Sequence, residues 1–119
     1  MEMAFGESTY GGSLRWWQSW RCAQCRGGAI EADGCGPLPP ELAALERARG
    51  GTWALVVDAC AGPAAWKALR EALGLEIADG VALKARLPGV VFEGTACHVG
   101  WLCDRVRAGG GVARVVRVA

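Results

Sequence analysis

The chain has 119 residues, with 13 Lys or Arg, 12 Asp or Glu and a formal net charge of +1. This balance gives no electrostatic basis for binding nucleic acid or a membrane surface, and the sequence contains no apolar run of bilayer-spanning length. The first residues lack the basic start and apolar centre of a secretion signal, so we expect a cytoplasmic protein with reduced thiols.

The N-terminal part carries half of the six cysteines. Residues 1–13 are polar and contain glycines, and we expect their end to be mobile. Residues 14–26 mix aromatic and polar side chains, which favours a strand that turns at a Cys-x-x-Cys motif. A short return strand and a third cysteine follow. This order of strand, cysteine turn, strand and cysteine resembles half of a zinc ribbon.

A structural zinc site needs four ligands, and the turn supplies Cys22 and Cys25, with Cys35 as a candidate third. The fourth ligand is open: a second chain is one source, and the candidates in this chain are Cys60, Cys97 and His98. The alternative is a turn that has kept its shape and lost the metal. A redox-active motif is a third interpretation, although the Arg-Gly-Gly that follows the motif is a poor helix start.

A short helix links this module to the rest of the chain. Pro39 and Pro40 suit the start of a helix, because a missing N–H costs little there. The predicted helix covers residues 41–49, has acidic residues early and basic residues late, and ends at a Gly-Gly pair. Leu42 and Leu45 share one of its faces. We therefore divide the chain into a Cys-x-x-Cys module with its linker helix at residues 1–50 and a second domain at residues 51–119.

The second domain alternates strands and amphipathic helices in the order β-α-α-β-α-β. Apolar, β-branched residues predict strands at 52–59, 90–92 and 112–118. The 3.6-residue period predicts helices at 64–73 and 76–87, and a third that starts after Thr95, a suitable N-cap. Gly80 costs a helix about 1 kcal/mol relative to Ala, so we expect it to permit close approach of two helices. Burial is expected at Ala65, Leu69, Ala72, Leu73, Ile77, Gly80, Leu83, Leu87, Val99, Leu102, Cys103 and Val106.

Residues 65–95 carry a run of short motifs, namely Lys-Ala-Leu-Arg at 67–70, Leu-Gly-Leu at 73–75, Pro-Gly-Val-Val at 88–91 and Glu-Gly at 93–94. This run resembles the C-terminal domain of the bacterial ribosomal stalk protein, and the resemblance extends over residues 53–118. ClpS-type adaptors share that fold. It implies an α+β sandwich, with three helices on one face of a three-stranded antiparallel sheet, preceded here by a Cys-x-x-Cys β-hairpin module and a short connecting helix. The bare face or an edge of such a sheet is then the expected place for residues 14–30.

In the stalk family, the open face of the first two helices touches translational GTPases, chiefly through basic residues. Lys67 and Arg70 match that pattern. Gly62 and Val81 stand where further basic residues are expected, and Trp66 replaces an aliphatic contact. The dimerisation segment and flexible hinge of the stalk protein have no counterpart here. The resemblance therefore implies a binding face without a role in the ribosomal stalk.

The candidate binding surface is formed by Trp66, Lys67, Arg70, Ile77 and Val81. Trp and Arg are favoured interface anchors, and a tryptophan outside the buried stripe calls for an explanation. The alternative explanation is that the N-terminal module or the 41–49 helix covers Trp66.

Cys97 and His98 lie at the start of the last helix, where a helix N-terminus lowers a thiol pKa. Adjacent helical residues point about 100° apart, however, so the two side chains do not form a hydrogen-bonded dyad. Cys60 and Cys103 are expected to be small buried residues. We therefore predict no catalytic residue and no enzyme activity.

The leading hypothesis is a non-catalytic cytoplasmic protein of bacterial type, which binds a protein partner as an adaptor or as an inhibitor of the immunity-protein kind. We expect a monomer or a homodimer, and structural zinc is the one cofactor that the sequence suggests. The alternative hypothesis is a metal- or redox-handling protein that uses Cys22, Cys25 and Cys35.

Overall fold

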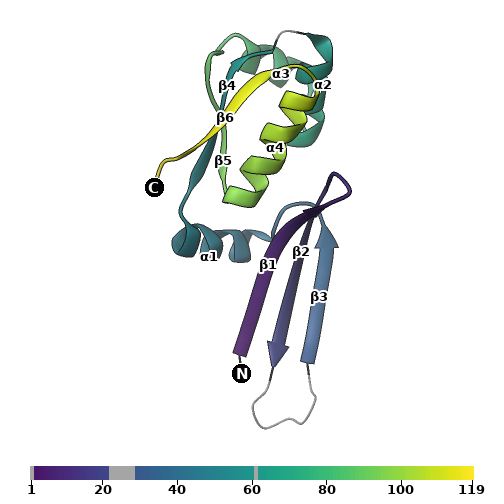
Figure 1. Ribbon diagram of the computed structural model, residues 1–119, viewed down its shortest axis with the longest axis vertical. Coiled ribbons are helices and arrows are strands. Elements are labelled where there is room, and N and C mark those ends of the chain that lie inside the picture. Colours follow the sequence, from purple (N-terminus) through teal and green to yellow (C-terminus); the bar gives the residue numbers. More distant parts are fainter. Residues whose placement is uncertain (1, 22–28, 61) are drawn as a thin grey trace.

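The computed structural model describes residues 2–21, 29–60 and 62–119. Within these residues the chain forms four helices and two antiparallel sheets of three strands each, which makes an α+β fold (Figure 1). The two sheets lie towards opposite ends of a molecule that measures 56 × 28 × 22 Å. None of the helices in this part of the chain is long and apolar enough to cross a membrane.

The N-terminal sheet has the strand order β1-β2-β3, with β1 at Glu2–Tyr10, β2 at Ser13–Arg21 and β3 at Ala29–Cys35. β1 pairs with β2 along its whole length, so the expectation that residues 1–13 have a mobile end is wrong for residues 2–10. The missed signal is the Gly-Gly pair, a two-residue hairpin turn. Gly11 and Gly12 have φ of 58° and 80°, which the turn requires and which glycine adopts without strain.

Two tryptophans of β2 lie across glycines of the neighbouring strands. A Cβ built on Gly6 of β1 would lie 2.9 Å from Nε1 of Trp17, and one on Gly34 of β3 would lie 2.7 Å from Nε1 of Trp16. Since adjacent residues of a strand point to opposite faces, the two indoles cover glycines on opposite sides of the sheet. The tryptophan pair therefore supplies the packing that the glycines lack.

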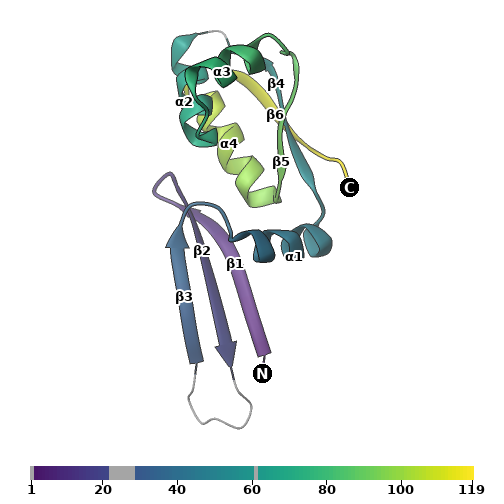
Figure 2. The ribbon, with the colours of Figure 1, turned by 180° about the vertical axis from the view of Figure 1, so that it is seen from behind.

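The linker helix, α1, spans Pro40–Gly50 and contains the predicted range. Leu42 is buried, whereas Leu45 is 48% exposed, so only the first of the two expected leucines packs inward. The helix joins the N-terminal sheet to β4 (Trp53–Ala59), the central strand of the second sheet (Figure 2).

The remaining elements follow the predicted sequence order. They are α2 (Pro63–Leu73), α3 (Ile77–Lys84), β5 (Gly89–Gly94), α4 (Ala96–Ala108) and β6 (Val112–Arg117), and the strands pair in the order β5-β4-β6. α3 ends at Lys84, three residues before the expected Leu87, and the chain turns there. Thr95 is the N-cap of α4 as predicted, since its Oγ1 accepts a hydrogen bond of 3.3 Å from the backbone N–H of His98.

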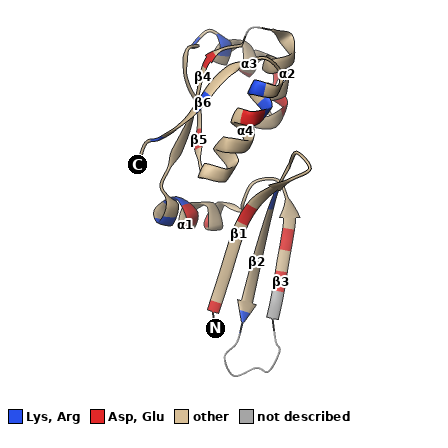
Figure 3. Ribbon diagram, in the orientation of Figure 1, with Lys and Arg blue, Asp and Glu red and all other residues tan. Residues whose placement is uncertain are grey.

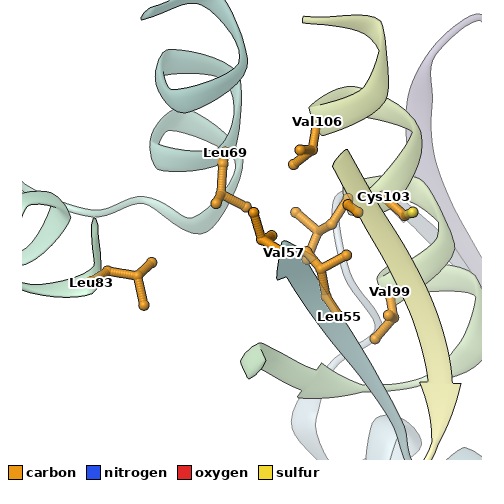
Figure 4. Packing of buried hydrophobic residues seen from close by; sticks show 9 residues of the cluster. Leu55, Val57, Leu69, Leu83, Val99, Cys103 and Val106 are labelled. Carbon is orange, nitrogen blue, oxygen red and sulfur yellow. The ribbon is translucent and has the colours of Figure 1, made fainter. Parts of the chain in front are cut away.

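The main core lies between the second sheet and the helices. α4 contacts all three strands of this sheet and packs against α2. Most of the expected positions are buried, and Figure 4 shows Leu69, Leu83 and Val106 of the helices converging on Leu55 and Val57 of β4. Ala72, Leu73 and Leu87 are partly buried against this core, whereas the side chain of Ile77 is 72% exposed. Its expected place in the core is therefore wrong.

The end of the chain is tied to the start of β4. The backbone N–H of Thr52 donates to the carbonyl of Ala119 at 3.1 Å, and that of Val118 donates to the carbonyl of Thr52 at 2.9 Å. Gly51 has φ of 90°, and a Cβ there would lie 2.8 Å from the Ala119 carbonyl oxygen. The connection between α1 and β4 is thus packed against the C-terminal residues.

The N-terminal sheet contacts α1 and α4 and shares no strand with the second sheet. Nε1 of Trp101 on α4 donates to the carbonyl of Gly12 in the β1–β2 turn at 2.9 Å. The guanidinium of Arg49 on α1 lies over the ring of Phe5, 4.6 Å from its centroid. β2 does not extend an edge of β5-β4-β6, so the edge, one of the two expected places for residues 14–30, is wrong.

Candidate functional site

The five residues of the predicted binding surface line one groove between α2 and α3. This α2–α3 groove has a volume of about 560 Å³. Trp66 and Arg70 are one helical turn apart on α2, and Ile77 and Val81 have the same spacing on α3, so each pair shares a helix face. The complete lining is Cys60, Gly62, Pro63, Trp66, Lys67, Arg70, Ile77, Val81 and Lys84.

The helices approach closely at Gly80, as the sequence predicts. A Cβ on Gly80 would lie 3.2 Å from Cδ of Arg70 and 3.6 Å from Cζ2 of Trp66. Gly80 itself is buried. Absence of a side chain there lets Arg70 and Trp66 of α2, which both line the groove, lie close to the backbone of α3.

Trp66 is half-buried and packs against the core without being covered by the N-terminal part of the chain. Among the described residues, those that line the groove all come from positions 60–84, and none belongs to α1 or the N-terminal sheet. In Figures 1 and 2, α1 and the N-terminal sheet lie towards the other end of the molecule from α3. The alternative explanation for this tryptophan is therefore not supported.

α3 presents two large apolar side chains to solvent at the groove. Ile77 is 72% exposed and Val81 is 63% exposed. Burying a Val or Ile side chain fully contributes about 1.5–3 kcal/mol. An apolar group that binds here would remove both side chains from water, and their burial would contribute favourably to the free energy of binding.

The charges at the groove have one sign, although residues of both signs occur in both parts of the described chain (Figure 3). The charged lining residues are Lys67, Arg70 and Lys84, and no acidic side chain lines the groove among the described residues. Lys67 has a contact of 3.9 Å with Glu71, but both side chains are more than half exposed, so solvent weakens the pair.

Sequence reasoning missed Lys84 as a residue of the groove. It lies one turn beyond Val81 on the same face of α3. The spacing of three and seven residues from Val81 and Ile77 is the signal that identifies it.

Cys60 also lines the groove, at the end of β4, and is not fully buried. Burial raises the pKa of its thiol, and the nearby ammonium of Lys84 lowers it in part. The net direction is upward, so the thiol stays protonated at neutral pH and is not an activated nucleophile.

The start of α4 does not activate Cys97. Burial raises the pKa of its thiol first, and the carboxylates of Glu7 and Glu46 raise it further. The ring of His98 packs edge-on against Phe92, with a centroid distance of 4.6 Å, and burial lowers its pKa. The two side chains thus have packing roles here, and the nucleophile interpretation gains no support.

The proposed zinc ligands are only partly placed by the structure. Cys22 and Cys25 lie outside the described residues, and Cys35 is exposed at the end of β3. Cys35 pairs with Arg15, whereas the opposite end of β3 pairs Ala29 with Arg21. At about 3.3 Å per residue, this places Cys35 roughly 20 Å along the strand from that end.

The other candidate ligands lie later in the chain, with Cys60 at the groove and His98 between Phe92 and Trp101. Over residues 2–21, 29–60 and 62–119, no three His, Cys, Asp or Glu side chains come together in an arrangement suited to a metal ion.

Comparisons of the chain with protein-family models, curated proteins and solved structures found no match.

Proposed function

We propose that the chain is a non-catalytic protein-binding module, an adaptor or an inhibitor of the immunity-protein kind, which acts in the cytoplasm through the α2–α3 groove. One observation carries this proposal: exposed Ile77 and Val81 face a groove whose three charged lining residues are all cations. Exposed apolar side chains bordered by charge are typical of protein interaction sites.

The groove favours a partner segment with apolar anchors and acidic neighbours. The anchors would cover Ile77, Val81 and the indole of Trp66, while carboxylates would pair with the cations at the rim. A basic segment would meet like charges and lose affinity.

The proposal includes the fold of residues 53–118. We propose that three helices lie on one face of the β5-β4-β6 sheet, as in the stalk-like and ClpS-like folds. The motifs of residues 65–95 and the element order β4-α2-α3-β5-α4-β6 support this view. Gly62 and Val81 replace basic residues of the stalk pattern, and for that reason the proposal does not extend to recruitment of translational GTPases.

A partner-capture experiment tests the groove. The full-length chain would be used as bait beside Trp66→Ala/Arg70→Ala and Ile77→Ser/Val81→Ser. The second variant changes only exposed side chains, so its free energy of unfolding should stay within about 0.5 kcal/mol of the parent value. The matched control is Leu45→Ala/Arg47→Ala, which removes an exposed apolar residue and an arginine from α1. Loss of the same partner from both groove variants and its retention by the control are expected; identical partners for all four proteins would reject the groove.

A metal- or redox-handling function is the second candidate, and one observation favours it. β2 ends at Arg21 and β3 begins at Ala29, so paired strands flank the segment that contains Cys22 and Cys25. Metal analysis of the full-length chain and of Cys22→Ser/Cys25→Ser decides the matter. Stoichiometric zinc that is lost together with the fold indicates a structural site. A labile metal, or a Cys22–Cys25 pair that cycles with a measurable redox potential, would favour this candidate. A metal-free parent chain without such redox cycling would remove it.

A further inference from the structure

Glu7 occupies the junction between the N-terminal sheet and the rest of the molecule. It belongs to β1, and its carboxyl lies against the Thr95 hydroxyl at the start of α4. Its Oε2 atom is buried and has no hydrogen-bond partner among the described residues. A buried carboxylate oxygen without a donor is unfavourable when ionised, because it has lost water and gained nothing in return.

The titratable groups that face Glu7 come from α1 and α4. Glu46 of α1 is close enough to act on its charge, and its own carboxylate pairs with Arg49 on the same helix. Cys97 of α4 faces Glu7 through a thiol whose pKa the Glu7 carboxylate raises. On β2 the residue opposite Glu7 is the uncharged Trp16. None of these described neighbours gives Glu7 a cation of its own.

The direction of the Glu7 titration follows from these contacts. Burial raises its pKa above the ordinary value of 4.5, the Glu46 carboxylate raises it further, and the hydrogen bond with Thr95 lowers it in part. An acid whose pKa is raised in the docked state binds a proton more tightly there than when the junction is open. By linkage, docking therefore becomes more favourable as the pH falls through the raised pKa towards 4.5.

We propose that Glu7 makes the contact between the N-terminal sheet and α1–α4 proton-sensitive, so that proton uptake by Glu7 tightens the junction and ionisation loosens it. Two contacts that do not involve the Glu7 side chain also hold the sheet in place. They are the hydrogen bond from Trp101 to Gly12 and the stacking of Arg49 on Phe5. The change is thus a loosening around Glu7 and not a release of the sheet. This inference is independent of the α2–α3 groove.

Two measurements on the full-length chain test the proposal. Carbon-detected NMR of the Glu7 carboxyl follows its titration directly. Amide hydrogen exchange, corrected for the intrinsic pH dependence of exchange, reports the opening of β1 and of the start of α4. Between about pH 8 and about pH 4, protection of these amides should rise by about tenfold for each unit by which the Glu7 pKa is raised.

The variants separate the charge from the packing. Glu7→Gln keeps the shape of the side chain and should give strong protection at neutral pH with no step on acidification. Glu46→Gln should lower the pKa of Glu7 and weaken the step while Glu7 is retained, and it serves if Glu7→Gln fails to fold. Glu2→Gln is the matched control, because Glu2 is an exposed glutamate of the same strand, and its step should equal that of the parent chain. Junction protection that is independent of pH in the parent chain, or a step that survives in Glu7→Gln, would overturn the proposal.

Discussion

Some positions near the core require glycine because neighbouring atoms leave no room for a Cβ, and not because of their backbone conformation. Gly109 follows α4 with an ordinary φ of −85°, so its conformation alone does not require glycine. A Cβ there would lie 2.6 Å from Cα of Ala65, which belongs to the backbone of α2. The contact brings the end of α4 against the first turn of α2.

We expect Gly109→Ala to lower the free energy of unfolding by about 1–3 kcal/mol, because backbone atoms must move to admit the methyl group. Gly100 is the matched control, since it lies inside α4 and a Cβ there would have no neighbouring atom within 4 Å. Gly100→Ala should instead raise the free energy of unfolding by about 0.5–1 kcal/mol through helix propensity. Urea unfolding of both variants measures the difference; equal effects would contradict the close contact at Gly109.

His98 gives a second test at the scale of a residue. Burial lowers its pKa below the ordinary value of 6.5, so the folded protein favours the neutral ring. The neutral His98 ring makes its full contribution to the free energy of unfolding above pH 6.5. This contribution is lost as the pH falls from 6.5 towards the lowered pKa, because the unfolded chain then binds the proton more tightly. In His98→Phe, which keeps an aromatic ring beside Phe92, this part of the pH dependence should disappear. Thermal unfolding across the pH range checks it, and an unchanged profile would exclude His98 as the cause.

At the scale of an element, the β1–β2 hairpin depends on its two-residue turn. Both Gly11 and Gly12 have positive φ, which costs a residue with a Cβ about 1–2 kcal/mol. Asparagine tolerates the left-handed region better and is common at the first turn position.

We expect Gly12→Ala to weaken amide protection throughout β1 and β2, by an amount equivalent to about 1 kcal/mol. Gly11→Asn should leave that protection unchanged, because the residue suits the same turn. Hydrogen exchange of the strand amides distinguishes the two. Equal protection in both variants would mean that the turn does not limit the stability of the hairpin.

The elements that sequence reasoning found and missed differ in where their stability comes from. The three helices of the second domain, and the strands β4 and β6, carry their own apolar pattern, such as Leu69 and Leu102 at core positions, so periodicity identifies them. β1 has little apolar pattern of its own, and the packing at its Gly6 comes from Trp17 of β2. Such a strand is stabilised by residues distant in sequence, and single-segment patterns do not show it.

The candidate site divides in the same way. Trp66, Arg70, Ile77 and Val81 follow helical spacing within two adjacent helices, so their convergence on one groove could be predicted from local sequence. The environment of Glu7 could not, since it is assembled from three elements that are far apart in the chain. The burial and the neighbours of the Glu7 carboxyl result from the packing of β1 on α1 and α4, and this packing depends on the whole fold.

At the scale of the whole molecule, its two sheets share no strand, and the described contacts between the N-terminal sheet and the helices are concentrated around the β1–β2 turn, Phe5 and Glu7. The arrangement of the two parts therefore depends on a limited junction together with the linker helix α1. Changes at that junction should alter the shape of the molecule more than they alter the stability of the β5-β4-β6 sheet and its helices.

The pairing of Thr52 with the last two residues gives this linker a mechanical role. A Gly-Gly pair at the end of a helix would ordinarily be a flexible hinge, yet here Val118 and Ala119 hydrogen-bond to Thr52, and the Ala119 carbonyl lies against Gly51. Removal of residues 118–119 should make the connection between α1 and β4 more flexible, because the hydrogen bonds to Thr52 are lost. Small-angle scattering should then give the truncated chain a larger radius of gyration than the intact chain, whose Cα atoms alone give 16.7 Å. The flexibility of the connection between the two sheets would thus depend on residues 118–119. A protein fused after Ala119 would therefore be expected to change that flexibility.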